Sequence, residues 1–175
     1  MKYYSGFSLS DDKELFTPYL KESAYTIAGF SYGAIKAFEE VLHSQTRIDT
    51  LQLFSPAFFQ NKSEKFKRMQ KMYFSKDKET YLESFLSSCF SPIDIDESVA
   101  IQEGSAEELE ELLDYVWSRG ELKRLQDRGI QIEVYLGSDD KIVDTQAVKE
   151  FFLPYATTYL INGAGHTLQN KPWRS

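Results

Sequence analysis

The sequence predicts an α/β protein with a mainly parallel sheet of about five strands. Short apolar segments alternate along the chain with amphipathic segments of helical period, the pattern produced by strands joined through crossover helices. A turn of small residues, Gly29-Phe30-Ser31-Tyr32-Gly33, joins one such strand to the next helix. The chain has 175 residues, 42% of them hydrophobic, which is enough for a sizeable core. We therefore expect one compact domain over residues 1–175.

The N-terminal part contains five expected elements. Met1-Lys2-Tyr3-Tyr4 begins a short strand at 1–5, and a helical pattern follows at 11–21. The apolar run Tyr25-Thr26-Ile27-Ala28 is typical of a buried strand, expected at 24–29. Apolar residues at helical spacing then predict helix 32–43, and another apolar run predicts strand 48–54.

The C-terminal part continues the alternation after a long insertion. Residues 56–128 separate two core strands, and within them Ser105-Ala106-Glu107-Glu108 is a capping box that predicts the start of a helix. Strand 130–136, helix 144–152 and strand 157–161 follow. The order of strands and helices therefore favours a parallel sheet interrupted once by the insertion.

Ser31 is the candidate nucleophile, because it occupies the centre of a G-x-S-x-G motif between a strand and a helix. Such a turn pushes the hydroxyl out of the sheet, and Gly29 and Gly33 remove side chains that would collide there. The free N–H groups at the start of the following helix favour developing negative charge. Small residues also cluster in ordinary strand-to-helix turns, so the motif alone leaves a purely structural turn as the alternative.

A serine nucleophile needs a base, and the chain has two histidines. His43 lies twelve residues after Ser31, near the end of the following helix and roughly 18 Å away at the rise of an α-helix. His166 instead follows the expected strand 157–161 in a glycine-rich loop. Active sites of parallel α/β sheets form at this carboxyl edge, so His166 is the candidate base.

Three aspartates follow the preceding strand and compete for the role of the acid that orients the base. Asp144 precedes helix 144–152 closely enough to be its N-cap. Asp139 and Asp140 are adjacent, so their side chains point in different directions. The residues by themselves leave the choice between these two open.

At this point the chain resembles the α/β-hydrolase superfamily, in which the nucleophile, acid and base occur in the order Ser, Asp, His. Ser31, Asp140 and His166 stand in that order, and Gly137 together with the apolar pair after Asp140 fits the register of the family. The resemblance favours Asp140 over Asp139. It implies a small α/β-hydrolase fold in which 56–128 is a helical cap insertion. Since 30 residues precede Ser31, the strands that open a full-length hydrolase sheet are expected to be missing.

The same resemblance suggests the oxyanion hole. Ser5-Gly6-Phe7-Ser8 follows the first strand, where relatives often carry a His-Gly-aromatic-Gly run, although Ser5 replaces the histidine. The backbone N–H groups of Phe7 and Tyr32 would then bind the carbonyl oxygen. The alternative is that Gly6 only makes a turn.

Charge is unevenly distributed. The chain carries a net charge of −7, yet residues 62–78 carry +5, which leaves −12 elsewhere. We expect these basic side chains to be exposed, either as a solvated helix face or as a site for an acidic partner. Nucleic acid is a less suitable partner, because the rest of the protein would repel phosphate. The candidate partner-binding residues are Lys62, Lys65, Lys67, Arg68 and Lys71.

A basic cap over a serine site is similar to the pimeloyl-acyl-carrier-protein methyl ester esterases of biotin synthesis, and most to their short, atypical form. The main stretches that carry this likeness are Tyr3-Tyr4-Ser5-Gly6-Phe7, Gly29 to Ala37 and Glu108 to Tyr115. The resemblance implies hydrolysis of a carrier-linked methyl ester without a cofactor. A broad carboxylesterase or thioesterase and a non-catalytic hydrolase-like binding module are the alternatives.

Other classes of protein are disfavoured by composition. The single cysteine, Cys89, cannot form an intrachain disulfide, and there is no His/Cys cluster typical of a metal site. No long apolar segment or signal peptide is evident. We therefore expect a cytoplasmic protein without a metal, a membrane or nucleic acid as a partner.

Overall fold

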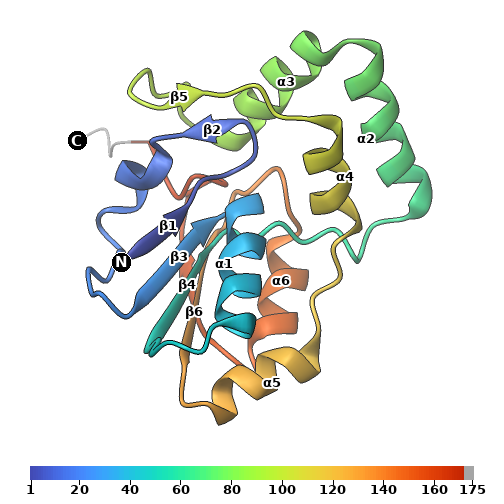
Figure 1. Ribbon diagram of the computed structural model, residues 1–175. Helices are drawn as coiled ribbons and strands as arrows, with labels where there is room; N and C mark the ends of the chain where they lie inside the picture. Colours follow the sequence, from blue (N-terminus) through green and yellow to red (C-terminus); the bar gives the residue numbers. More distant parts are fainter. Residues whose placement is uncertain (172–175) are drawn as a thin grey trace.

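The computed structural model describes residues 1–171, which form an α/β domain around a parallel sheet of five strands (Figure 1). The strands are β1 (Lys2–Tyr4), β2 (Leu9–Ser10), β3 (Thr26–Phe30), β4 (Thr50–Phe54), β5 (Ala100–Ile101), β6 (Gln131–Gly137) and β7 (Thr157–Ile161). The helices are α1 (Tyr32–His43), α2 (Glu64–Lys76), α3 (Lys78–Phe90), α4 (Ala106–Asp114), α5 (Arg119–Asp127) and α6 (Thr145–Phe152). A 3₁₀ helix, η1, spans Asp12–Phe16.

The five parallel strands lie in the order β1-β3-β4-β6-β7, and β2 pairs with β5 in a small separate sheet. Every residue of the central strands β3 and β4 is buried, as expected of strands covered on both faces. Their register pairs Ile27 with Leu51 and Phe30 with Phe54. At the edge, β7 exposes Tyr159 and Leu160. The central strands therefore provide the rigid part of the domain.

The expected helix at 11–21 is wrong, because only the five-residue η1 forms there. Thr17 still has helical dihedral angles, but Pro18 after it has no N–H to donate, so the regular hydrogen-bonding pattern of a helix is interrupted at this point. The segment still contributes to the core, since Phe16 is fully buried and its ring stacks 4.7 Å from that of Phe54. Apolar spacing thus identified a buried segment but not its backbone conformation.

Helices α1, α5 and α6 cover the sheet, and their apolar faces form the larger core. Helix α5 lies within the expected 56–128 insertion, yet it packs near α1 at the end of the sheet opposite to α2, α3 and α4 (Figure 1). Arg128, just after α5, donates hydrogen bonds of 2.8 Å to the Val41 carbonyl and 2.9 Å to the Ser44 carbonyl. A cation there satisfies carbonyl groups that the end of α1 leaves free.

Helices α2, α3 and α4 form a cap beyond the carboxyl ends of the strands (Figure 1). The predicted capping box is confirmed: the Ser105 hydroxyl accepts from the Glu108 N–H, and the Glu108 carboxylate accepts from the Ser105 N–H. Lys71 of α2 forms salt bridges with Glu110 and Asp114 of α4, which join these two helices. None of the helices in residues 1–171 is long and apolar enough to cross a membrane.

Candidate active site

Ser31 occupies a sharp turn between β3 and α1. Its backbone has φ 53° and ψ −114°, in the left-handed half of conformational space that residues other than glycine rarely adopt. A Cβ on Gly29 would collide with the Gly33 carbonyl, and one on Gly33 would collide with the carbonyls of Tyr4 and Ser5. Glycine is therefore required at both motif positions. The strained turn is stabilised by a 2.9 Å hydrogen bond from the Ser31 N–H to the Phe54 carbonyl.

His166 lies in the loop after β7, and its Nε2 is 2.9 Å from the Ser31 hydroxyl. Its Nδ1 is 2.7 Å from Oδ2 of Asp140. Because a carboxylate can only accept, Nδ1 carries the proton and Nε2 of the neutral ring accepts from the serine hydroxyl. The imidazole is fully buried against the ring of Phe30, with 5.1 Å between ring centroids.

Asp140 is the aspartate that contacts His166. Its second oxygen, Oδ1, accepts hydrogen bonds from the N–H groups of Ile142 at 2.7 Å and Val143 at 3.0 Å, which fix the carboxylate. The neighbouring Asp139 instead accepts from the Ser138 hydroxyl. Asp144 is the N-cap of α6, as expected, and accepts from the Ala147 N–H. The structure thus brings Ser31, His166 and Asp140 into one hydrogen-bonded chain.

The second histidine does not take part in this arrangement. His43 is the last residue of α1, and its Nδ1 lies 2.8 Å from the Glu39 carbonyl in the preceding turn. Its side chain is 76% exposed. His166 is therefore the histidine positioned to act on Ser31.

The loop expected to complete an oxyanion hole lies against the Ser31 turn, as the close approach of Gly33 to the Tyr4 and Ser5 carbonyls requires. Within residues 1–171, the backbone N–H groups of Phe7 and Tyr32 have no hydrogen-bond partner. Both residues are buried. Backbone N–H groups without partners near a serine hydroxyl are the kind of donor that an oxyanion hole uses.

A cavity of about 600 Å³ lies between the cap helices and the loop after β6. Its apolar lining includes Phe59, Phe66, Tyr81, Phe85, Leu109 and Leu112. Two lining residues connect it to the site. Phe85 packs on Phe7 with 5.6 Å between ring centroids, and Ile142 donates its N–H to Asp140. Ser31 itself is only 5% exposed, so its side chain is shielded from solvent.

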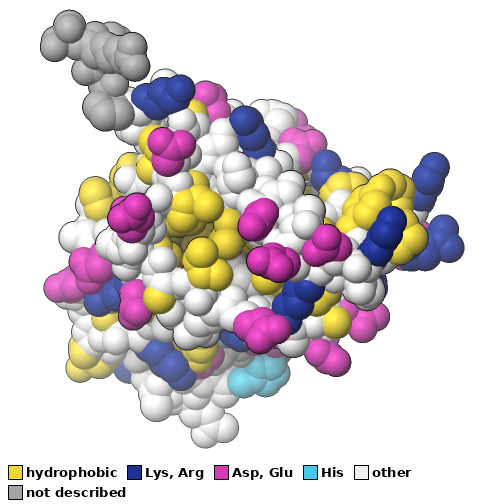
Figure 2. Space-filling model, turned by 90° about the horizontal axis from the view of Figure 1, so that it is seen from above, with side chains coloured by type: hydrophobic (Ala, Val, Ile, Leu, Met, Phe, Trp, Pro, Cys, Tyr) yellow, Lys and Arg dark blue, Asp and Glu magenta, His cyan; other side chains and the backbone are white. Residues whose placement is uncertain are grey.

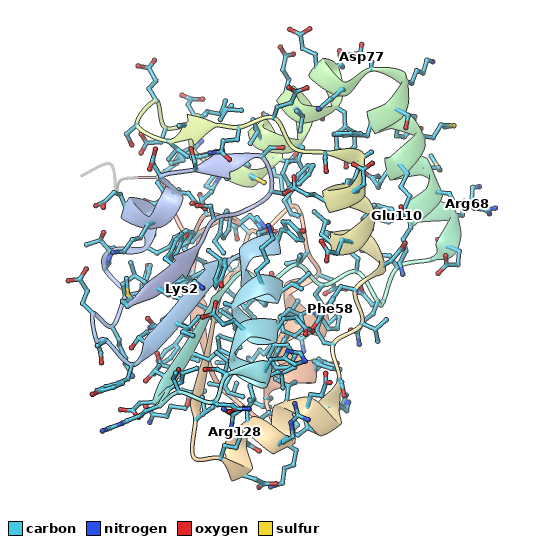
Figure 3. The ribbon with its side chains drawn as sticks, viewed as in Figure 1. Lys2, Phe58, Arg68, Asp77, Glu110 and Arg128 are labelled. Atoms are coloured by element: carbon cyan, nitrogen blue, oxygen red, sulfur yellow. The ribbon has the colours of Figure 1, made fainter. Side chains whose placement is uncertain are left out.

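The five basic candidates for partner binding are not equivalent. The expectation that they are all exposed is wrong for Lys67, which is buried, while Lys71 is held in salt bridges with Glu110 and Asp114. Lys62 lies over the ring of Phe66. Lys65 and Arg68 extend into solvent, and Figure 3 shows Arg68 pointing away from α2. The sequence pattern predicted the basic helix, but it could not show which of its basic side chains would be buried or held in salt bridges within the cap.

No group of three His, Cys, Asp or Glu residues within the described residues 1–171 could hold a metal ion. Burial raises the pKa of the Cys89 thiol well above its ordinary value, which keeps it protonated. Asp12, for which the sequence pattern predicts no role, is buried beside the Gly6 N–H. Only the aspartate pair before an apolar Leu15-Phe16 segment could have drawn attention to it.

The sequence matches no protein-family model and no curated protein. The structure is similar to naproxen esterase (carboxylesterase NP) from Bacillus subtilis, with 17% identity, a TM-score of 0.57 and coverage of 82% of this chain and 53% of that one. It is also similar to an esterase from Exiguobacterium antarcticum, with 16% identity, a TM-score of 0.63 and coverage of 89% of this chain and 64% of that one. A third similar structure is MenH from S. aureus, with 14% identity, a TM-score of 0.58 and coverage of 94% of this chain and 85% of that one. The chain spans about half to two thirds of the length of the two esterases, and the likeness shows an α/β-hydrolase fold.

Proposed function

We propose that this protein is a serine hydrolase that cleaves carboxylic esters through an acyl-enzyme. The observation that carries the proposal is the hydrogen-bonded chain from the Ser31 hydroxyl through His166 to Asp140. Such a chain can raise the nucleophilicity of a hydroxyl that is otherwise a weak nucleophile. The strained Ser31 backbone and the free N–H groups beside it support the same chemistry.

In the proposed mechanism, His166 Nε2 removes the Ser31 proton as the hydroxyl oxygen attacks the ester carbonyl. Asp140 holds the imidazole in the required tautomer and stabilises its charged form. The N–H groups of Phe7 and Tyr32 bind the oxyanion. His166 then returns the proton to the leaving alcohol, and water attacks the acyl-enzyme by the same route, releasing the acid. No step needs a cofactor.

The cavity under the cap favours a substrate with an apolar acyl group, which would bind inside it. Its volume of about 600 Å³ lies within the range typical of small-molecule sites, and its walls are largely aromatic and aliphatic. Lys76, Lys141 and Asp77 also line it, so a polar end of the substrate would meet a net positive charge there. A medium-length chain fits these features better than a bare acetate.

The substrate we propose is the methyl ester of pimeloyl-acyl-carrier protein, with the acidic carrier binding an exposed face of α2, which we name the α2 stripe. Its members are Lys65, Arg68, Met69, Met72, Tyr73 and Lys76, all exposed. They recur at helical spacing, and Figure 2 shows hydrophobic side chains beside Lys and Arg on the side where α2 lies in Figure 1. Salt bridges in this region use Lys67, Lys71 and Lys78 instead. Exposed apolar side chains among cations suit an acidic partner that also has apolar contacts.

Reaction with a fluorophosphonate probe tests the nucleophile. We expect labelling of the native protein at Ser31 and hydrolysis of p-nitrophenyl butyrate, and neither in Ser31→Ala. Ser75→Ala, at an exposed position of α2, is the matched control and should keep both activities. A native protein that neither labels nor hydrolyses esters would support the non-catalytic binding module.

Comparison of carrier-linked with free methyl pimelate tests the substrate. We expect Lys65→Glu/Arg68→Glu to raise KM for the carrier-linked ester and to leave the free ester unchanged, with the effect shrinking at high salt. Lys123→Glu, on the distant α5, is the charge-matched control. Equal rates on both esters, unaffected by the reversals, would indicate a broad carboxylesterase or thioesterase.

A further inference from the structure

Asp12 is a buried carboxyl group that the proposed triad does not use. Asp12 is fully inaccessible to solvent, and its Oδ2 accepts a 2.9 Å hydrogen bond from the Gly6 N–H. Its other oxygen, Oδ1, is also buried and has no hydrogen-bond partner within residues 1–171. The side chains of Ser5 and Tyr3 face this carboxyl group, and burial still disfavours its charged form.

The Gly6 N–H that Asp12 holds belongs to the loop preceding Phe7. On the other side of the same residue, the Gly6 carbonyl accepts a 3.2 Å hydrogen bond from the Leu9 N–H. Two successive peptide groups are thus anchored, one by Asp12 and one by Leu9. Together they fix the backbone dihedral angles of Gly6, the residue type with the greatest freedom to rotate. The direction of the Phe7 N–H depends on those angles, because it belongs to the peptide that follows Gly6.

The surroundings of the loop do not replace this anchor. Ser8, with φ 59°, accepts at its hydroxyl from the Gly104 N–H at 3.2 Å, and the Phe7 ring packs on Phe85. These contacts hold the side chains and the later part of the loop. The peptide between Ser5 and Gly6 is held by Asp12. Removal of that acceptor would release the first of the two anchored peptides.

We propose that Asp12 is a positioning residue, which aims the Phe7 N–H at the oxyanion by holding the Gly6 N–H. The inference rests on the proposed ester hydrolysis and adds to it a residue outside the triad. Asp12 touches no reacting atom and acts through the backbone of Gly6. Burial raises the pKa of this carboxyl group, so its negative charge, which would oppose the oxyanion, is disfavoured.

Such a role predicts a particular kinetic signature. An interaction made only in the transition state lowers kcat and kcat/KM together and leaves KM unchanged. Deletion of an oxyanion donor lowers kcat by about 10²- to 10³-fold, so misdirecting one should lower it by about 10- to 100-fold. Asp12→Asn keeps an oxygen that can accept from Gly6 and should therefore retain kcat to within about threefold.

The test compares p-nitrophenyl butyrate hydrolysis by Asp12→Ala, Asp12→Leu and Asp12→Asn, with folding followed by circular dichroism. Leucine fills the same volume without an acceptor, so it separates the hydrogen bond from packing. The exposed Glu14→Ala on the same 3₁₀ helix is the control. We expect the kcat loss in the alanine and leucine variants only.

Either of two results would overturn the proposal: unchanged kcat in a folded alanine or leucine variant, or a folded asparagine variant that loses more than about tenfold. If the alanine and leucine variants fail to fold, the asparagine variant still tests the proposal, because its loss of more than about tenfold would overturn it. A native protein without esterase activity would overturn the proposed function instead, so the two failures are distinguishable.

Discussion

The ring of Phe7 packs edge-on against the ring of Phe85, with 5.6 Å between their centroids and 78° between their planes. Phe7 belongs to the loop beside the Ser31 turn, whereas Phe85 belongs to α3 of the cap. Phe74 of α2 lies 6.3 Å from the same Phe7 ring. One side chain of the proposed oxyanion loop is thus packed between two helices of the cap, and the cap and the loop are mechanically connected.

Phe85→Ala should weaken this connection. We expect the free energy of unfolding to fall by about 2 kcal/mol, because a half-buried aromatic side chain is lost. The kcat for a short ester should fall more than in Met72→Ala, whose side chain is 55% exposed on α2. Urea unfolding and steady-state kinetics measure the two effects. A loss of stability with unchanged kcat would show that the loop keeps its position without the cap.

Asp140→Asn should lower kcat by about 10⁴-fold, because an amide at this position favours the wrong tautomer of the imidazole. Asp139→Asn should stay within about twofold of the native protein, since Asp139 contacts Ser138 instead of His166. Single-turnover kinetics on p-nitrophenyl butyrate measure both. A large loss in the Asp139 variant would show that the acid is misassigned.

Glu133→Ala should destabilise the sheet. The Glu133 carboxylate is 3% exposed and accepts from Gln52 at 3.0 Å and from the Tyr135 hydroxyl at 2.9 Å, and it also pairs with Lys21. Its removal leaves buried donors unpaired, so we expect a loss of about 3 kcal/mol in urea unfolding. Glu22→Ala, which removes an exposed salt bridge to Lys13, is the control. Similar unfolding midpoints for the two variants would contradict the prediction.

The stability of the native protein relative to Asp12→Asn should decrease as the pH rises. Burial raises the pKa of Asp12 above its ordinary value of 3.8, so the folded state binds the proton more tightly than the unfolded chain. The contribution of this carboxyl group is fully present below pH 3.8 and is lost as the pH rises through the folded-state pKa. Tyr3, which faces Asp12, has its own pKa raised by burial and does not titrate in this range. Urea unfolding midpoints of the two proteins from pH 4 to pH 7 measure this relative stability. A native protein that becomes more stable relative to Asp12→Asn as the pH rises would contradict the prediction.

The residues of the candidate site could be predicted because each follows a strand of the same parallel sheet. Ser31, Asp140 and His166 come after β3, β6 and β7, and the carboxyl ends of these strands meet at one edge. The choice of Asp140 needed the register of a known family, since two adjacent aspartates are equivalent in sequence alone. In the structure, the hydrogen bond to His166 and those from the Ile142 and Val143 N–H groups of the same loop single out Asp140.

Other features depend on tertiary contacts that a sequence pattern does not carry. The segment at 11–21 has helical spacing of its apolar residues, but Pro18 limits the regular structure to η1. Lys67 is one of several lysines on α2, and only the packing of the cap decides that it is the buried one. Asp12 looks like an ordinary polar residue, and its burial follows from the position of the Gly6 loop above it.

The residues of the proposed triad are far apart along the chain, so they are synthesised at different times. The serine turn belongs to the buried centre of the sheet, whereas the imidazole comes from a loop beyond the edge strand β7. During synthesis, the N-terminal residues can begin to fold before the last strand leaves the ribosome. Under the proposed mechanism, the hydroxyl has no base until β7 has joined β6, because His166 follows that strand. We therefore expect labelling of Ser31 by a covalent probe to report that the last strand has joined the sheet.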